Sequence, residues 1–302
     1  MIPKAKALKL IAIYLYICQL HDNELKHLSQ RYSNNDEPEF TDQEIMTIYI
    51  YAMQQEQRFR ISQIHAFADD YLRSWFPALP SYQAFNNRLN RLSEPLKALT
   101  AHLMTDLKPQ DCSQNTSLLD SMPIITCSGK RAGKVAQEIT DKGYCSTKSL
   151  YYYGLKLHVL AFQRPKQMPF PEHVVLSPAS ENDLNVFKHN WGEISDRDFY
   201  GDKIYHHADY FEDLALNNRA CMFTPVKGVK GMPEIIKMQN KAADDLYSTA
   251  VSKVRQPIES LFNWLIEKTD IQRASKVRSA KGLLVHVFGR MAAAFFYLIF
   301  NS

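Results

Sequence analysis

The spacing of apolar residues changes near residue 115, and this change constrains the fold more than any other feature of the sequence. Before it, apolar residues recur at helical spacing, and Thr41 and Glu44 form a capping box ahead of the run "IMTIYIYAM". After it, apolar residues come in short runs, and in "SLYYYGLKLHVLAF" Leu155, Leu157 and Val159 alternate with other residues. We therefore predict an all-α N-terminal region over residues 1–110 and an α/β domain over residues 111–302.

The second region contains five candidate strands. Its first three strands follow one another, and helices then alternate with the remaining strands. Such an order favours a mixed five-stranded sheet with helices on its faces, which is the order of a ribonuclease-H-like fold. The predicted strands are 117–126, 149–162, 172–180, 197–205 and 220–225; the predicted helices are 181–190, 209–217 and 251–268, the last after a polar linker.

The N-terminal region contains a candidate DNA-reading pair of helices at residues 61–92. The sequence predicts a helix over 61–76, a break at "PALP", and a helix over 82–92 capped by Ser81. On this last helix Gln83, Asn87 and Arg91 point away from the apolar stripe, and such side chains pair with base edges in the major groove. Two helices joined by a short turn suit a helix-turn-helix, although a solvated helix face has the same composition.

Three carboxylates occupy corresponding places in the predicted α/β region. Asp120 lies on the first strand, Asp202 at the end of the fourth, and Glu259 on the last helix. In the predicted sheet the fourth strand lies beside the first, so the three side chains converge. Clustered carboxylates repel one another without a cation, whereas two Mg²⁺ ions about 4 Å apart catalyse phosphodiester hydrolysis on such oxygen ligands. We expect a site for two Mg²⁺ ions, with Mn²⁺ able to substitute.

The segment "VSKVRQPIESLFNWLIEK" places Arg255 four residues before Glu259, with Pro257 in the first helical turn. Two interpretations of Arg255 stay open. It forms a simple salt bridge that supports the helix, or it contacts a phosphate at the DNA end and orients Glu259.

These blocks together resemble the DDE transposases of bacterial insertion sequences, nearest to the insertion sequence 982 family, across roughly residues 115–300. The matching blocks are "LLDSMPI", "YYYGLKLH", "LSPASENDLNVF", "YGDKIY" and "RQPIESLFNWL". The resemblance implies that Asp120, Asp202 and Glu259 are the catalytic and metal-binding D, D and E. It departs from the related signature on the last helix, because Ser252 and Ile266 stand where a tyrosine and a lysine are common.

The resemblance also implies an activity. The protein would bind the terminal inverted repeats of its element and nick DNA with a metal-activated water to free a 3′-OH. That 3′-OH would then attack target DNA. We expect a homodimer on DNA in the bacterial cytoplasm at the nucleoid, with no membrane and no small-molecule substrate. Two alternatives stay open: a ribonuclease-H-like nuclease or resolvase without transposition, and a non-catalytic DNA-binding protein derived from a transposase.

Basic residues that contact DNA must lie in local patches, because the net charge of the 302-residue chain is only +4. The candidates are Lys130, Arg131 and Lys134 between the first two strands, Lys203 beside Asp202, Lys227 and Lys230 after the fifth strand, and Lys276, Arg278 and Lys281 before the C-terminal helix. Solvated surface is the alternative for each cluster.

Two further patterns are consistent with an intracellular protein. The apolar run 283–300 contains His286 and Arg290, which are costly in a membrane, so we predict a buried helix. The five cysteines are scattered and indicate neither a disulfide framework nor a zinc site.

Overall fold

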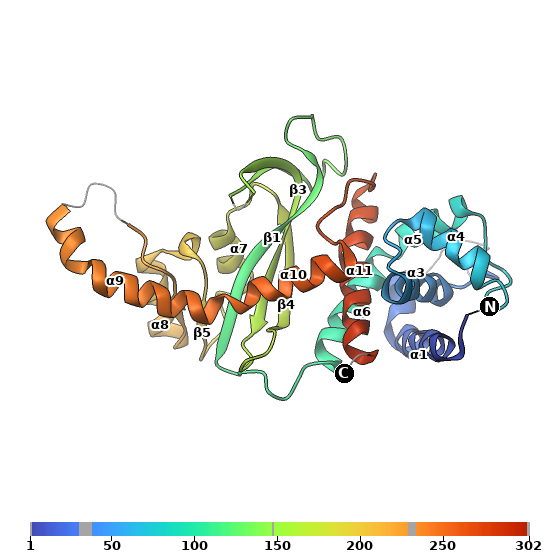
Figure 1. Ribbon diagram of the computed structural model, residues 1–302, viewed down its shortest axis with the longest axis horizontal. Coiled ribbons are helices and arrows are strands. Elements are labelled where there is room, and N and C mark those ends of the chain that lie inside the picture. Colours follow the sequence, from blue (N-terminus) through green and yellow to red (C-terminus); the bar gives the residue numbers. More distant parts are fainter. Residues whose placement is uncertain (1, 30–37, 147, 229–233, 301–302) are drawn as a thin grey trace. The chain divides into compact units, whose positions relative to one another are not determined.

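The computed structural model describes residues 2–29, 38–146, 148–228 and 234–300, so Lys230 lies outside the described residues. The chain forms two compact units, which we describe separately (Figure 1). Unit 1 comprises residues 1–107, 134–138 and 265–302, and unit 2 comprises residues 108–133 and 139–264. Unit 1 thus takes in residues 265–302, which the sequence assigned to the second domain. The domain boundary at residue 110 stays a prediction.

Helices joined by short connections make up most of the described residues of unit 1. The predicted capping box begins α3: Thr41 Oγ1 accepts from the Glu44 backbone N–H at 3.3 Å, and the Glu44 carboxylate accepts from the Thr41 N–H at 2.5 Å. Residues 45–54 of α3 are all buried, so this helix lies in the core of the unit. The helices are α1 (Lys4–Leu20), the π-helix η1 (His21–Leu25), α2 (Lys26–Ser29), α3 (Asp42–Glu56), α4 (Ile61–Tyr71), α5 (Tyr82–Arg91), α6 (Ser93–Asp106) and α11 (Ala280–Phe300).

The helix α11 confirms the buried C-terminal helix. Among the described residues it is the one helix long and apolar enough to cross a membrane, but 72% of its apolar window is buried inside the protein. Its polar side chains have partners there: His286 Nε2 donates to the Ile271 carbonyl at 2.7 Å, and Arg290 donates to the carbonyls of Thr269 and Phe59. These contacts are typical of a core helix.

The helices α4 and α5 are not joined by the short turn that we predicted. The helix α4 ends at Tyr71 rather than at residue 76, and residues 72–81 connect it to α5, whose N-cap is Ser81 as predicted. Past the end of α4, the backbone N–H groups of Trp75 and Phe76 both donate to the Leu72 carbonyl at 2.9 Å, which turns the chain out of the helix. A helix-turn-helix turn has about three or four residues.

Unit 2 contains a mixed sheet, and its described residues form six strands rather than the predicted five. The order is β2-β3-β1-β5-β6, with β4 also paired to β3. The central strand β1 is antiparallel to β3 and parallel to β5. This arrangement is consistent with a ribonuclease-H-like fold. The strands are β1 (Thr116–Ser128), β2 (Asp141–Cys145), β3 (Leu150–Phe162), β4 (Phe170–Pro178), β5 (Asp198–Tyr200) and β6 (Cys221–Phe223).

The additional strand β2 has the sequence "DKGYC", which lacks the alternating apolar pattern of a strand. It forms because it pairs with the long strand β3, in a register that joins Lys142 to Tyr153 and Tyr144 to Tyr151. A short polar strand of this kind depends on its partner and not on its own composition.

Helices cover both faces of the sheet in unit 2. Leu119 of β1 belongs to a core cluster that includes Phe187 and Trp191 of the α7 region and Leu214 of α8. Successive strand residues point to opposite faces, so Asp120 points away from this cluster, toward α9, which contacts β1 and β5 (Figure 1). The helices are α7 (Asp183–Asn190), the 3₁₀-helix η2 (Lys203–Tyr205), α8 (Ala208–Asn218), α9 (Glu234–Arg255) and α10 (Pro257–Thr269).

The segment before Val251, predicted as a polar linker, is largely the helix α9. The prediction was wrong because the charged and amide residues of this segment were interpreted as a linker, although Ile235, Met238 and Leu246 recur at helical spacing. The helix leaves these side chains 71%, 71% and 74% exposed. The predicted helix 251–268 is also divided. The helix α9 ends at Arg255 and α10 begins at Pro257, where proline is tolerated because the first turn needs no backbone N–H.

Candidate active site

The sheet brings Asp120 and Asp202 to the same level. In the parallel pair of β1 and β5, Leu118 lies opposite Tyr200. Asp120 lies two residues after Leu118, still within β1, and Asp202 lies two residues after Tyr200, just past the end of β5. The strand β5 is shorter than predicted, because the Asp202 carboxylate accepts from the Ile204 backbone N–H at 2.9 Å and caps η2.

Arg255 links Asp120 to Glu259. Its guanidinium donates from one nitrogen to Asp120 Oδ2 at 2.7 Å and from another to Glu259 Oε1 at 2.8 Å. The side chains of Arg255 and Asp120 are 17% and 22% exposed, whereas that of Glu259 is 54% exposed. The salt bridge to Glu259 therefore exists, but Arg255 also neutralises a carboxylate on the central strand. This second contact distinguishes it from an ordinary surface pair.

The two aspartates hold their protons more tightly than usual. Burial raises the pKa of Asp120 to about 6; Arg255 opposes this shift, and the charges of Asp202 and Asp183 add to it. Burial is also the main cause that raises the pKa of Asp202, and the charge of Asp183 contributes. Each carboxylate thus lies within the field of others, which is the electrostatic condition that favours binding of a cation.

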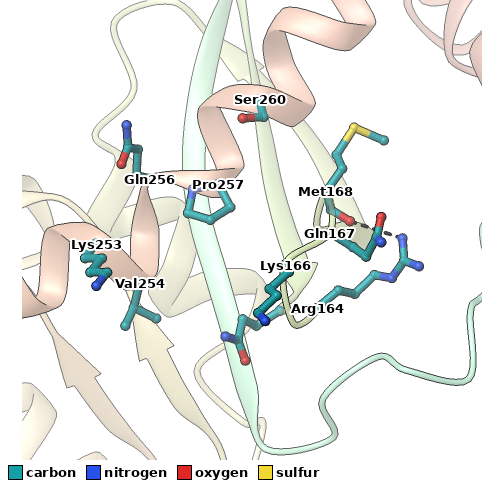
Figure 2. Close-up of a pocket in the computed structure, with 10 residues that line it drawn as sticks. Arg164, Lys166, Gln167, Met168, Lys253, Val254, Gln256, Pro257 and Ser260 are labelled. Carbon is teal, nitrogen blue, oxygen red and sulfur yellow. Dashed lines mark hydrogen bonds between the residues drawn. The ribbon is translucent and has the colours of Figure 1, made fainter.

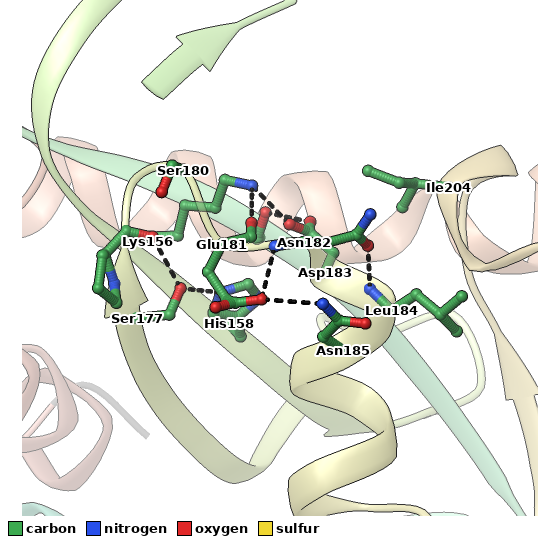
Figure 3. Close-up of polar contacts among 12 residues, drawn as sticks. Lys156, His158, Ser177, Ser180, Glu181, Asn182, Asp183, Leu184, Asn185 and Ile204 are labelled. Atoms are coloured by element: carbon green, nitrogen blue, oxygen red, sulfur yellow. Dashed lines mark hydrogen bonds and ion pairs between the residues drawn. The ribbon is translucent and has the colours of Figure 1, made fainter. Parts of the chain in front are cut away.

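A second polar cluster lies on the opposite face of β1. Asp183, at the start of α7, accepts a hydrogen bond from Ser121 at 2.6 Å and pairs with Lys156 Nζ at 2.7 Å. Lys156 also donates to the Glu181 carbonyl at 2.7 Å, and the Asp183 side chain is only 9% exposed (Figure 3). This cluster fixes the residue next to Asp120, and its carboxylate raises the pKa of both Asp120 and Asp202.

Neither a role for Asp183 nor its ion pair with Lys156 was predicted from the sequence. An aspartate in the first turn of a helix is common for helix-dipole reasons alone, and a single lysine on an alternating strand is no signal. Nearby, His158 makes a 2.8 Å hydrogen bond with Ser177, and burial lowers the pKa of His158 to about 4 (Figure 3). His158 is therefore neutral near pH 7.

The donor set fits a hard divalent cation in its chemistry, because carboxylate oxygens are the ligands that Mg²⁺ prefers. Among the described residues, however, no three histidine, cysteine, aspartate or glutamate side chains are arranged to hold one ion. Arg255 instead provides the positive charge between Asp120 and Glu259.

The other predicted DNA-binding residues lie apart from this cluster or on the surface. Lys203 follows Asp202 directly and is exposed. Lys130 and Arg131 are exposed and follow the far end of β1. Ser128, the last residue of that strand, is eight positions after Asp120, which corresponds to roughly 26 Å of extended chain. This loop therefore lies away from the carboxylates, and the expectation that it lies beside them was wrong. The exposed residues Lys134, Gln83, Asn87 and Arg91 belong to unit 1.

A hollow of about 680 Å³ lies where α9 passes into α10 (Figure 2). The exposed lysines Lys166 and Lys253 line it together with Arg164. Arg164 is held by Asp111 at 2.8 Å and by the Met168 carbonyl at 3.2 Å. The hollow is basic and adjoins the residues that flank Arg255 in the chain.

A ribonuclease-H-like sheet with acidic residues on adjacent central strands defines a class of domains that act on nucleic acids. Within that class, the family model described as "Transposase DDE domain" matches residues 112–296, more than half of the chain, and the protein belongs to this family. Comparisons with curated proteins and with solved structures gave no significant match. Family membership indicates transposase activity, DNA as the partner, and divalent metal ions as the usual cofactor.

Proposed function

We propose that this transposase binds the terminal inverted repeats of an insertion sequence and cleaves DNA there in a metal-dependent reaction. The freed 3′-OH then attacks a phosphodiester of target DNA, which joins the element end to the target and releases the target's own 3′-oxygen. The observation that carries the proposal is the grouping of Asp120, Asp202 and, through Arg255, Glu259 within unit 2. Assignment to the insertion sequence 982 family remains part of the proposal.

In this proposal Asp120, Asp202 and Glu259 hold two Mg²⁺ ions, with Mn²⁺ as a substitute. Bound cations would stabilise charge on the phosphate and favour deprotonation of the attacking water or 3′-OH. Asp120 and Asp202 suit this role because both are partly buried and both lie near further negative charge, so a cation relieves their repulsion. No histidine is needed as a base.

Arg255 has two roles in the proposal. Without metal it neutralises Asp120 and holds Glu259. When cations bind these carboxylates, its guanidinium is released and pairs with a phosphate oxygen of the DNA end, which it can contact through two N–H groups.

DNA contacts outside the carboxylate cluster come from basic surface residues. Lys203 lies next to Asp202, and Lys166 and Lys253 line the hollow beside Arg255. Lys130, Arg131 and Lys134 are proposed to contact DNA away from the scissile phosphate. Gln83, Asn87 and Arg91 on the exposed face of α5 are proposed to read the repeat. The protein is expected to act as a homodimer, since two element ends must be brought together.

The test is cleavage of a labelled duplex that carries the element's terminal repeat, with Mg²⁺ or Mn²⁺, by the wild type and by the variants Asp202→Asn and Glu259→Gln. We expect nicking at the repeat boundary by the wild type and none by either variant. Asp213→Asn is the matched control, because Asp213 is an exposed carboxylate of unit 2 on α8. Retained nicking by Asp202→Asn would refute the assignment.

The same reaction distinguishes a transposase from a nuclease or resolvase. A nicked repeat with a free 3′-OH is incubated with a supercoiled target plasmid. Joined product supports transposition. Metal-dependent cutting without joining supports the nuclease, and binding of the repeat without cutting supports a non-catalytic DNA-binding protein.

A further inference from the structure

Unit 1 contains a groove of about 870 Å³ whose lining includes none of Asp120, Asp202 and Glu259. Five segments line it: α3 through Tyr49, the start of α4 with the two residues before it, one side of α5, the connection between α10 and α11 (residues 270–279), and the first half of α11. The groove thus combines N-terminal helices with a segment some 180 residues later in the chain.

The groove is strongly basic. Arg60, Arg273, Lys276 and Arg278 are exposed at its rim, and Arg290 lies in its lining. Asp270 is the only carboxylate among the lining residues. Five cations and one carboxylate give the lining a net charge of +4, equal to that of the whole chain. Such a concentration of charge on one concave surface attracts a polyanion.

Arg290 adds a buried cation to this surface. Its residue is 5% exposed, and it donates to the carbonyls of Thr269 and Phe59 rather than to a carboxylate. Its Nε is buried without a hydrogen-bond partner among the described residues. Arg290 also has a side-chain hydrogen bond with Tyr49. A desolvated guanidinium whose hydrogen-bond partners are neutral carbonyls and a hydroxyl keeps its charge, so it strengthens the positive potential in the groove.

Two helix N-termini also open on the groove. Ile61, Ser62 and Gln63, the first residues of α4, are among its lining, and no side chain caps this helix. Ser279 and Gly282 line it at the start of α11. At the start of α11 the Gly282 backbone N–H donates to Ser279 Oγ at 3.1 Å, so of these two helices it is α4 that presents uncapped N–H groups. Uncapped backbone N–H groups and the positive end of the helix dipole favour phosphate oxygens.

The side of α5 that faces the groove is polar. Tyr82, Asn86 and Asn90 recur every four residues and all line it. A side chain at Gly282 would meet Asn90 Oδ1 at 2.9 Å, so glycine permits the close approach of α11 to α5. This stripe neighbours the one formed by Gln83, Asn87 and Arg91. Amide and hydroxyl groups between cations are suited to hydrogen bonds with the sugar-phosphate backbone.

We propose that this groove binds the sugar-phosphate backbone of duplex DNA, with Arg273 and Lys276 in the 270–279 connection contacting phosphates. The inference rests on the proposed function, since it names a surface that holds the DNA on which the transposase acts. It joins residues 270–279, where the sequence already named Lys276 and Arg278 as candidate DNA contacts, to the predicted DNA-reading helices 61–92 in one groove.

The test measures binding of the full-length chain to a fluorescein-labelled mixed-sequence duplex of about 30 base pairs, in EDTA, between about 50 and 200 mM salt. Each phosphate contact contributes about 0.9 to the slope of log affinity against log salt. The double variant Arg273→Gln/Lys276→Gln is expected to lower the magnitude of that slope by about 2. Neither side chain is buried, and Arg273 has only a 3.8 Å pair with Asp270, so the fold should persist.

The matched control is Lys4→Gln/Lys26→Gln, which removes two exposed cations of unit 1 outside the groove. A second variant, Asn86→Asp, adds a negative charge to the lining and is expected to weaken binding without removing any lysine or arginine. If the groove double variant has the same salt slope as the control variant, the inference is wrong. The proposed function would still stand, because other surfaces of the protein would then hold the DNA. If the wild type itself shows no salt-dependent binding, both the inference and the proposed function are wrong.

Discussion

Replacing Asp120 with asparagine should stabilise the metal-free protein near neutral pH. Burial raises the pKa of Asp120 from 3.8 to about 6, so the folded protein holds a proton that the unfolded chain has lost. The stabilisation from this proton is complete below pH 3.8 and is lost as the pH rises through about 6. The ionised carboxylate then costs stability.

The magnitude follows from the shift. A rise of about two units, at about 1.4 kcal/mol each, amounts to about 3 kcal/mol of unfolding free energy. Because the Asp120 side chain is 22% exposed and keeps some hydration, we expect about 2–3 kcal/mol. Asparagine has nearly the same shape as the protonated acid and does not ionise, so Asp120→Asn should avoid this cost.

Urea denaturation in EDTA measures the effect. At pH 7.5 the free energy of unfolding of Asp120→Asn should exceed that of the wild type by about 2–3 kcal/mol, and the difference should shrink toward zero as the pH falls to about 4. Asp213→Asn, which changes an exposed carboxylate of the same unit, should show no such dependence. A variant less stable than the wild type at pH 7.5, or a difference that does not change with pH, would refute the reasoning.

Two further predictions concern ion pairs of unit 2. Arg255→Gln should cost about 2–4 kcal/mol of stability at pH 7.5, because it leaves Asp120 without its 2.7 Å partner. The cost should be smaller in a protein that also carries Asp120→Asn. Additive effects of the two substitutions in a double-mutant cycle measured by urea denaturation would contradict this. Lys156→Met should cost about 3 kcal/mol of stability, because it leaves the Asp183 carboxylate, which is 9% exposed, without its cation. Adding Asp183→Asn should recover much of that stability. If the single and double variants unfold at the same temperature, the ion pair is unimportant for stability.

Much of the fold was predictable because it depends on local patterns. The capping box at Thr41 needs only residues three apart, and the long strand β3 has its own alternation. The strand β2 was missed because it has no clear apolar pattern and forms by pairing with β3. The helix α9 was missed because polar residues outnumber its apolar ones, and it leaves most of its large apolar side chains exposed.

For the candidate site, the sequence determined which carboxylates are available and where each lies on its element. Asp120 interrupts a buried strand, Asp202 follows a short one, and Glu259 begins a helix, and these positions depend on residues within a turn or a strand of each other. Together with the predicted strand order, they indicated that Asp120 and Asp202 lie near each other. The register of β1 and β5 pairs Leu118 with Tyr200, two residues before each aspartate, and the charge of Asp202 raises the pKa of Asp120.

Only the tertiary structure decided how the charges are paired. Arg255 and Asp120 are 135 residues apart in sequence, and Lys156 and Asp183 are 27 apart. In the same way, the groove of unit 1 joins α5 to residues 270–279. Periodicity reports how a segment buries its own apolar side chains, whereas an ion pair or a groove depends on which segments pack together and on the orientation of each side chain.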